Sequence, residues 1–273
     1  MFCIPDGGLE MSSKSVRNPA VAGLFYPARA RELQQLVRTY LASAHSKGAT
    51  PKAIIAPHAG YIYSGAIAAS AYVRLMEARE TITRVILLGP AHRVPFRGLA
   101  VPTVDSLATP LGEVAVDKAA VAQLANLPQV HVMDEAHASE HSLEVHLPFL
   151  QTVLSHFTLV PLAVGEATPA QVGEVLDCLW GGAETLIVIS SDLSHYHDYE
   201  TAQRMDSATS RAIEQLRLED IEYEQACGRV PINGLLYVAR KRGLSAETVD
   251  LRNSGDTAGP RDQVVGYGAY VFH

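Results

Sequence analysis

Four short runs of the chain are apolar at almost every consecutive position. A strand with one solvated face alternates apolar and polar residues, whereas a strand covered on both faces is apolar throughout. The runs therefore predict buried strands that lie side by side in a largely parallel sheet. They are KAIIAP at 52–57, RVILLGP at 84–90, FTLVPLAV at 157–164 and TLIVISSD at 185–192.

Helical periodicity follows three of these runs, over SGAIAASAYVRLMEA (64–78), PAQVGEVLDCLW (169–180) and about 199–217. Pro169 suits the first turn of its helix. Strands that alternate with helices predict an α/β fold with a mainly parallel central sheet and helices on both faces. LSAETVDLRN (244–253) and DQVVGYGAYVF (262–272) are expected to form two further strands at an edge.

No repeat, linker or low-complexity segment divides the chain after its first residues. We expect a flexible N-terminal lead-in at 1–15, rich in Pro, Gly and Ser, and one α/β domain at 16–273. Met1 and Met11 are both compatible with the native start.

Composition and charge exclude several classes of protein. The 273 residues carry a net charge of −7, and the basic residues are scattered, which argues against nucleic acid as a partner. No apolar run is long enough to span a membrane, and the N-terminus lacks the features of a signal peptide. Three cysteines at 3, 178 and 227 show no disulfide spacing. We therefore expect a cytoplasmic protein, with Cys178 in the core.

Three of the predicted strands end in polar residues. His58 follows the first, His92 the second, and Asp192 and His195 the last. Because ligands of open α/β sheets bind beyond the carboxyl ends of the strands, these side chains are expected to share one crevice. A histidine taken alone is better explained as a strand cap that bonds a backbone carbonyl. All four on one edge of the sheet favour a shared site.

A second group of polar residues lies in SEHSLEVHLPF, at 139–149. On a helix, His141 and Glu144 share a face at i and i+3. His146 lies five positions after His141, so the segment is not the HExxH zinc motif. His141 and Glu144 are candidate acid–base or supporting groups. The alternative is the polar face of a helix that Ser139 caps.

Cys227 and three serines are further candidates. Cys227 precedes Gly228 and a predicted helix, a position that suits either a reactive thiolate ligand or an inert buried thiol. Tyr61 and Tyr63 either place a phenol in the cleft or pack against the sheet. A serine nucleophile in SSDLSH (190–195) is disfavoured, because the segment lacks the glycine-flanked turn that exposes one.

Seven segments together resemble the MEMO family, known in bacteria and archaea as AmmeMemoRadiSam system protein B. The resemblance covers nearly the whole chain after the lead-in, in matching order. The segments are NPAVAGLFYP (18–27), APHAGYIYSG (56–65), GPAH (89–92), EHSLEVHLPF (140–149), SSDLSH (190–195), CGRVPI (227–232) and NSGDTAGPRDQVVGYGAYVF (253–272).

The resemblance implies a fold similar to that of class III extradiol dioxygenases, which are non-haem Fe(II) enzymes. It also implies that iron or copper is held by His58, His92 and Cys227. Four other polar residues match groups that line the same cleft, namely Asp192, His195, His141 and Glu144. The resemblance also implies a functional link to a radical-SAM protein and an AMMECR-type protein.

Three functions are compatible with these residues. The first is a redox enzyme, with Fe(II) as the expected metal, that acts with O₂ on a small or peptide-borne substrate. His195 would be its acid–base group, and Asp192 would orient an imidazole. The second is a zinc hydrolase with His195 or Glu144 as base. The third is a non-catalytic module that binds metal or peptide.

One departure separates this chain from the extradiol dioxygenases. Those enzymes use two histidines and a glutamate, whereas the implied third ligand here is a thiolate, which is softer and also compatible with Cu or Zn. Ring cleavage of catechols is therefore not expected by analogy.

Overall fold

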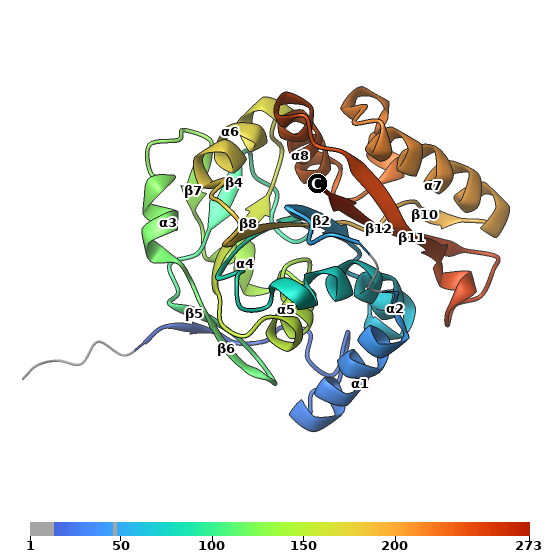
Figure 1. Ribbon diagram of the computed structural model, residues 1–273, viewed down its shortest axis with the longest axis horizontal. Helices are drawn as coiled ribbons and strands as arrows, with labels where there is room; N and C mark the ends of the chain where they lie inside the picture. The colour runs from blue at the N-terminus through green and yellow to red at the C-terminus, as the bar shows by residue number, and fades with distance from the viewer. Residues whose placement is uncertain (1–13, 46–47) are drawn as a thin grey trace, which may run out of the picture.

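The four apolar runs form neighbouring strands at the centre of a nine-stranded sheet (Figure 1). The computed structural model describes residues 14–45 and 48–273. Adjacent strands among these four all run parallel, as predicted. In their order across the sheet they are β2 (Ala53–Ala56), β9 (Thr185–Ser190), β3 (Arg84–Pro90) and β8 (Thr158–Val164).

Antiparallel strands extend this core at both edges. Beyond β2 lies β12 (Val264–Phe272), which also pairs with β11 (Ala246–Asn253) and β10 (His195–His197). The edge pair predicted from the C-terminal sequence is therefore β11 and β12. Beyond β8 lie β4 (Leu99–Val101) and β7 (Val130–Val132).

A separate three-stranded sheet joins the start of the described chain to a hairpin. It contains β1 (Val16–Arg17), β5 (Ser106–Thr109) and β6 (Gly112–Ala115).

Helices cover both faces of the central sheet, as predicted. Side chains alternate between the faces, so Ile54 and Val85 join one apolar core while Ile55 and Ile86 join the other. The first core is completed by α1 (Ala30–Ser43), α2 (Tyr61–Tyr72) and α5 (Leu147–Val153). The second is completed by α3 (Lys118–Gln123), α6 (Pro169–Leu179), α7 (Tyr199–Glu214) and α8 (Arg229–Arg242).

Short helical turns connect these elements. They are η1 (Val73–Ala78), α4 (Glu135–Ala138), η2 (Glu144–His146), η3 (Leu218–Asp220), η4 (Tyr223–Gln225) and η5 (Ser254–Asp256).

Two local predictions are wrong. The segment 139–149 is not one helix: its first part is irregular, η2 follows, and α5 begins only at Leu147, with a proline in its first turn. His141 and Glu144 consequently do not share a helical face. Cys178 is exposed on α6 rather than in the core.

The N-terminal lead-in falls largely outside the described residues, as do Cys3 and Met11 within it. Its last two residues contact the small sheet: Lys14 pairs with Glu113, and Ser15 donates to Asp105.

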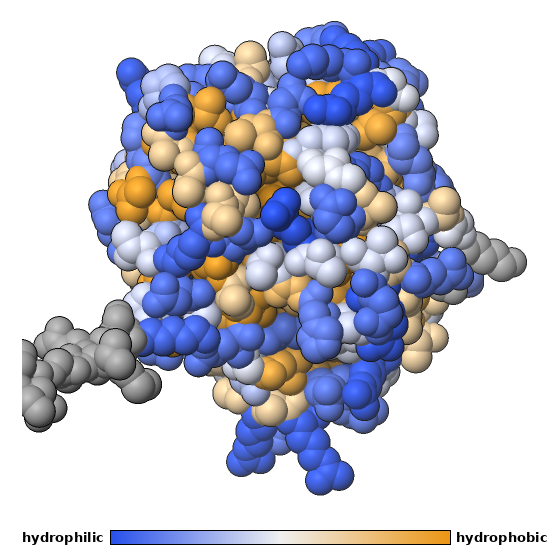
Figure 2. Space-filling model, turned by 60° about the vertical axis from the view of Figure 1, so that its left-hand side comes forward, coloured by the Kyte–Doolittle hydropathy of each residue, from blue (hydrophilic) through white to orange (hydrophobic). Residues whose placement is uncertain are grey.

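Within 14–45 and 48–273, no helix is both long enough and apolar enough to cross a membrane. One face of the surface is largely hydrophilic, with hydrophobic residues scattered among the polar ones (Figure 2).

Gly89 lets a loop pack tightly against the end of β3. A Cβ at this position would lie 2.7 Å from Ser142 Oγ and 2.9 Å from Leu143 Cδ2. The loop that carries these two residues therefore rests directly on the strand that leads to His92.

We expect Gly89→Ala to lower the free energy of unfolding by about 1–3 kcal/mol, because overpacking forces the loop to move. Urea denaturation of the variant and the wild type measures the loss. An unchanged midpoint would show that the loop is not packed as described.

Candidate metal centre

A cavity of about 1550 Å³ lies beyond the carboxyl ends of the central strands. Its wall includes His58 after β2, His92 after β3, and Asp192 and His195 after β9. Cys227, just before α8, also lines it. The structure thus brings together the polar residues that the strand ends predicted, and it adds the cysteine implied by the family resemblance.

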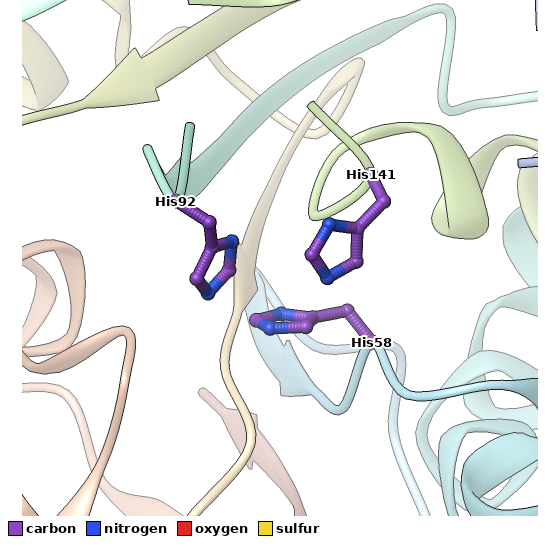
Figure 3. Close-up of side chains that lie close together, drawn as sticks. All are labelled: His58, His92 and His141. Carbon is purple, nitrogen blue, oxygen red and sulfur yellow. The ribbon is translucent and has the colours of Figure 1, made fainter. Parts of the chain in front are cut away.

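Three imidazoles that line this cavity converge on one another (Figure 3). One ring nitrogen from each of His58, His92 and His141 lies within 4.8 Å of the others. The ring centroids of His92 and His141 are 4.8 Å apart, and that of His58 is 5.1 and 5.4 Å from them. We call these three residues the histidine cluster.

Hydrogen bonds fix the tautomer of His58. Its Nδ1 lies 2.6 Å from Ser190 Oγ, and the Ser190 hydroxyl donates its own proton to the carbonyl of Ser142 at 2.6 Å. Nδ1 of His58 must therefore be the donor, which leaves a lone pair on Nε2. Burial, reinforced by the neighbouring histidines, holds the pKa of His58 well below its usual value, so the ring stays neutral.

The carboxylate of Glu140 orients the other two histidines. It accepts hydrogen bonds from the backbone N–H of His92 (2.6 Å), His141 (2.9 Å) and Ser142 (2.9 Å), and lies 2.9 Å from His92 Nδ1. Although burial opposes ionisation, these bonds lower the pKa of Glu140 to about 2. A carboxylate on the second ring nitrogen is typical of metal-binding histidines.

His141 is the third member of the histidine cluster. Its buried Nδ1 has no hydrogen-bond partner among the residues that the structure describes, although Glu140 Oε1 is 3.3 Å away. Burial lowers the pKa of His141 to about 4, so the ring is neutral. A neutral imidazole with an available ring nitrogen fits a metal ion.

Cys227 lies beside the cluster but is not part of it. Its Sγ is 3.4 Å from His58 Nε2 and accepts the backbone N–H of Asp192 at 3.3 Å. Burial, then the nearby Asp192, raises the pKa of the thiol. Cys227 is therefore a protonated thiol within reach of the lone pair of His58.

Asp192 and His195 occupy the same wall. Asp192 Oδ1 accepts the backbone N–H of His58 at 2.7 Å, and Oδ2 is 4.0 Å from His58 Nε2. Burial raises the pKa of Asp192 to about 7 and lowers the pKa of His195 below its ordinary value. Asp192 can therefore exchange a proton near neutral pH, whereas the lowered pKa of His195 keeps that ring neutral there.

Glu144 does not line the cavity, which corrects the expectation that it shares the cleft. Its fully buried carboxylate instead pairs with Arg17 and accepts hydrogen bonds from the backbone of Ala20 and Val21 and from the Tyr26 hydroxyl. Because η2 replaces the expected helix, the side chains of His141 and Glu144 are directed to different places.

Among the remaining candidate residues, one lines the cavity and the others are buried away from it. Tyr63 lines the cavity, whereas Tyr61 is buried and donates to the carbonyl of Val145. The three serines of SSDLSH are fully buried and are not among the residues that line the cavity, so the structure offers no serine nucleophile in this segment.

Sequence reasoning missed Glu140. The only signal was its position directly before His141, since a metal-binding histidine commonly has a carboxylate partner.

The fold and the cluster define an α/β protein with a candidate metal site at the carboxyl edge of its sheet. The sequence model of the family described as Memo-like protein matches residues 17–271. The chain therefore belongs to the Memo family. The α/β fold described above agrees with the fold expected for this family.

Curated relatives match most of the chain. A MEMO1 family protein from Aquifex aeolicus is 36% identical, and one from Archaeoglobus fulgidus is 38% identical; in both, the match covers 94% of this chain and 99% of the relative. Among solved structures, an uncharacterized protein from Escherichia coli is 16% identical with a TM-score of 0.49, over 80% of this chain and 98% of the other.

Asp206 of α7 supports the turn that carries His195. Its buried carboxylate accepts the backbone N–H of Ser194 at 3.0 Å. Burial raises its pKa to about 6, although the bonds from Ser194 and the nearby His197 act against this. The folded protein therefore binds this proton more tightly than the unfolded chain does.

We expect the stability contributed by the protonated Asp206 to be lost as pH rises from about 4 through 6. The wild type should lose up to roughly 3 kcal/mol of unfolding free energy relative to Asp206→Asn over this window, since one pKa unit equals about 1.4 kcal/mol. Urea denaturation of both proteins at several pH values measures the difference. A difference that is constant with pH would contradict the raised pKa.

Proposed function

We propose that this protein binds a redox metal, Fe(II) in the first instance, at the histidine cluster and uses it with O₂ on a small or peptide-borne substrate. His58 and His92 are the two constant ligands. The third is Cys227, as the resemblance implies, or His141, as the cluster suggests. The observation that carries the proposal is the convergence of three imidazoles in the wall of a large cavity.

The chemistry of the donors supports iron without excluding copper or zinc. Imidazole nitrogen suits all three metals, and a thiolate favours the softer ones. The resemblance to non-haem Fe(II) enzymes is what favours iron. A bound metal would supply electron transfer or Lewis-acid chemistry at this wall.

The protein's own groups would position the substrate and move protons. His195 is neutral at physiological pH and lines the cavity, so it can accept a proton from a substrate hydroxyl or amine. Asp192 holds the backbone of His58 and, with a pKa of about 7, can accept or release a proton beside that ring.

The hydrolase hypothesis keeps one base rather than two. Because Glu144 is engaged with Arg17 and the N-terminal segment, only His195 remains as the proposed base of a zinc-dependent reaction. Two histidines and a cysteine are a known set of catalytic zinc ligands. Metal identity therefore separates the two functions.

We expect the wild type, purified without oxygen, to contain close to one equivalent of iron by elemental mass spectrometry. His58→Ala should lose at least about 90% of it, because a site built from three protein ligands does not survive the loss of one. Cys227→Ala and His141→Ala identify the third ligand, since only the true ligand should match the loss in His58→Ala.

His156→Ala is the matched control, because His156 is an exposed histidine outside the cavity wall. If the wild type contains zinc in place of iron, and the same variants lose it, hydrolysis becomes the proposed function. Metal content that is equal in all variants and in the control would refute the assigned site.

A further inference from the structure

Arg17 and the segment NPAVAGLFYP (18–27) play no part in the proposed chemistry, yet they are bound to the loop that carries His141. Residues 17–26 converge on the carboxylate of Glu144. The Arg17 guanidinium forms an ion pair with it, the backbone N–H groups of Ala20 and Val21 donate to it at 2.7 and 3.0 Å, and the Tyr26 hydroxyl donates as well. Four donors satisfy a carboxylate that is fully buried.

Arg17 also holds the loop at two further points. Its Nε donates to the carbonyl of His137 at 3.1 Å, and its Nη2 donates to the carbonyl of Glu140 at 2.6 Å. One side chain, only 8% exposed, thus bonds to residues 137, 140 and 144 of the same loop. Glu140 and His141 lie between these points of attachment.

Phe25 extends this arrangement to the cluster. Its ring centroid lies 4.8 Å from that of His141, and the side chain lines the cavity. The imidazole of His141 therefore has Phe25 and His92 as ring neighbours, while its backbone N–H is held by Glu140. The N-terminal segment contacts His141 directly through Phe25 and indirectly through Arg17.

We propose that the Arg17–Glu144 ion pair is a positioning element of the metal site. By fixing the 137–144 loop, it places the Glu140 carboxylate against His92 and sets the position of His141. Arg17 is a positioning residue, since its three bonds go to the loop and not to the cavity. The proposal rests on metal binding at the histidine cluster.

Physical chemistry indicates why such a pair would serve positioning. A buried ion pair adds little net stability, because desolvation offsets the attraction, but removal of one partner leaves the other charge uncompensated. A planar guanidinium can hold three acceptors in fixed directions, which an ammonium group does not do as well. Groups that orient metal ligands typically change metal affinity by about 10- to 100-fold when mutated.

The test compares two ion pairs between an arginine and a carboxylate, one buried and one partly buried. Arg17→Gln removes the pair at the loop. Arg84→Gln removes the Arg84–Asp117 pair, at 2.8 Å and partly buried, whose residues do not line the cavity. Co(II) is the probe, titrated anaerobically against a chelator, because its visible spectrum reports both affinity and ligand geometry. Thermal denaturation of each protein measures the change in stability separately.

We expect Arg17→Gln to bind Co(II) about 10- to 100-fold more weakly than the wild type, with an altered spectrum. Arg84→Gln should bind Co(II) with an affinity within about twofold of that of the wild type, even if its melting temperature is lower. Arg17→Lys keeps the charge beside Glu144 but not the fork geometry, so it is the variant to use if Arg17→Gln fails to fold, and it should also bind more weakly.

Wild-type affinity and spectrum in a folded Arg17→Gln or Arg17→Lys variant would overturn the positioning role while leaving the metal site intact. Equal weakening in Arg84→Gln would overturn it too, by showing a general effect of stability. Failure of the wild type to bind Co(II) or Fe(II) would overturn the proposed function and this inference together.

Discussion

The buried carboxylate of Glu140 connects two parts of the chain that the fold brings to the same edge of the sheet. It accepts hydrogen bonds from the backbone after β3 and from its own loop, and it contacts the ring of His92. Each buried donor left without its acceptor would cost roughly 1–3 kcal/mol. The relative positions of His92 and His141 therefore depend on this one side chain.

The rest of the site follows from the parallel centre of the sheet. β2, β3 and β9 all end at one edge, so they deliver His58, His92 and Ser190 to the same place. Ser190 then plays for His58 the role that Glu140 plays for His92. Nδ1 of His58 and Nδ1 of His92 each contact a protein partner. Nε2 of each of these rings is therefore left for the cluster. Cys227 joins this edge from the turn that precedes α8.

The strands and the histidines at their ends were predictable because both depend on simple rules. Continuous apolar runs specify strands covered on both faces, and parallel strands end at one edge. These two rules are sufficient to bring His58, His92, Asp192 and His195 to one edge of the sheet. The approach of Cys227 to His58 did not follow from its local sequence, which favoured an inert buried thiol. It followed from the family resemblance.

The 139–149 loop was mispredicted because tertiary contacts override its helical pattern. Ser142 and Leu143 pack on Gly89 near the end of β3, and Glu140 accepts hydrogen bonds from three backbone N–H groups, so η2 and α5 start later. The partnership of Glu144 with Arg17 spans more than a hundred residues and left no local trace in the sequence. Interactions of this kind cannot be obtained from periodicity alone.

The most direct test of the central claim is a crystal structure of the iron-loaded protein, with diffraction measured on both sides of the iron absorption edge. The account predicts one anomalous peak bonded to His58 and His92, with Cys227 or His141 as the next protein ligand. An anomalous peak outside this cavity, with the histidine cluster unchanged, would contradict it.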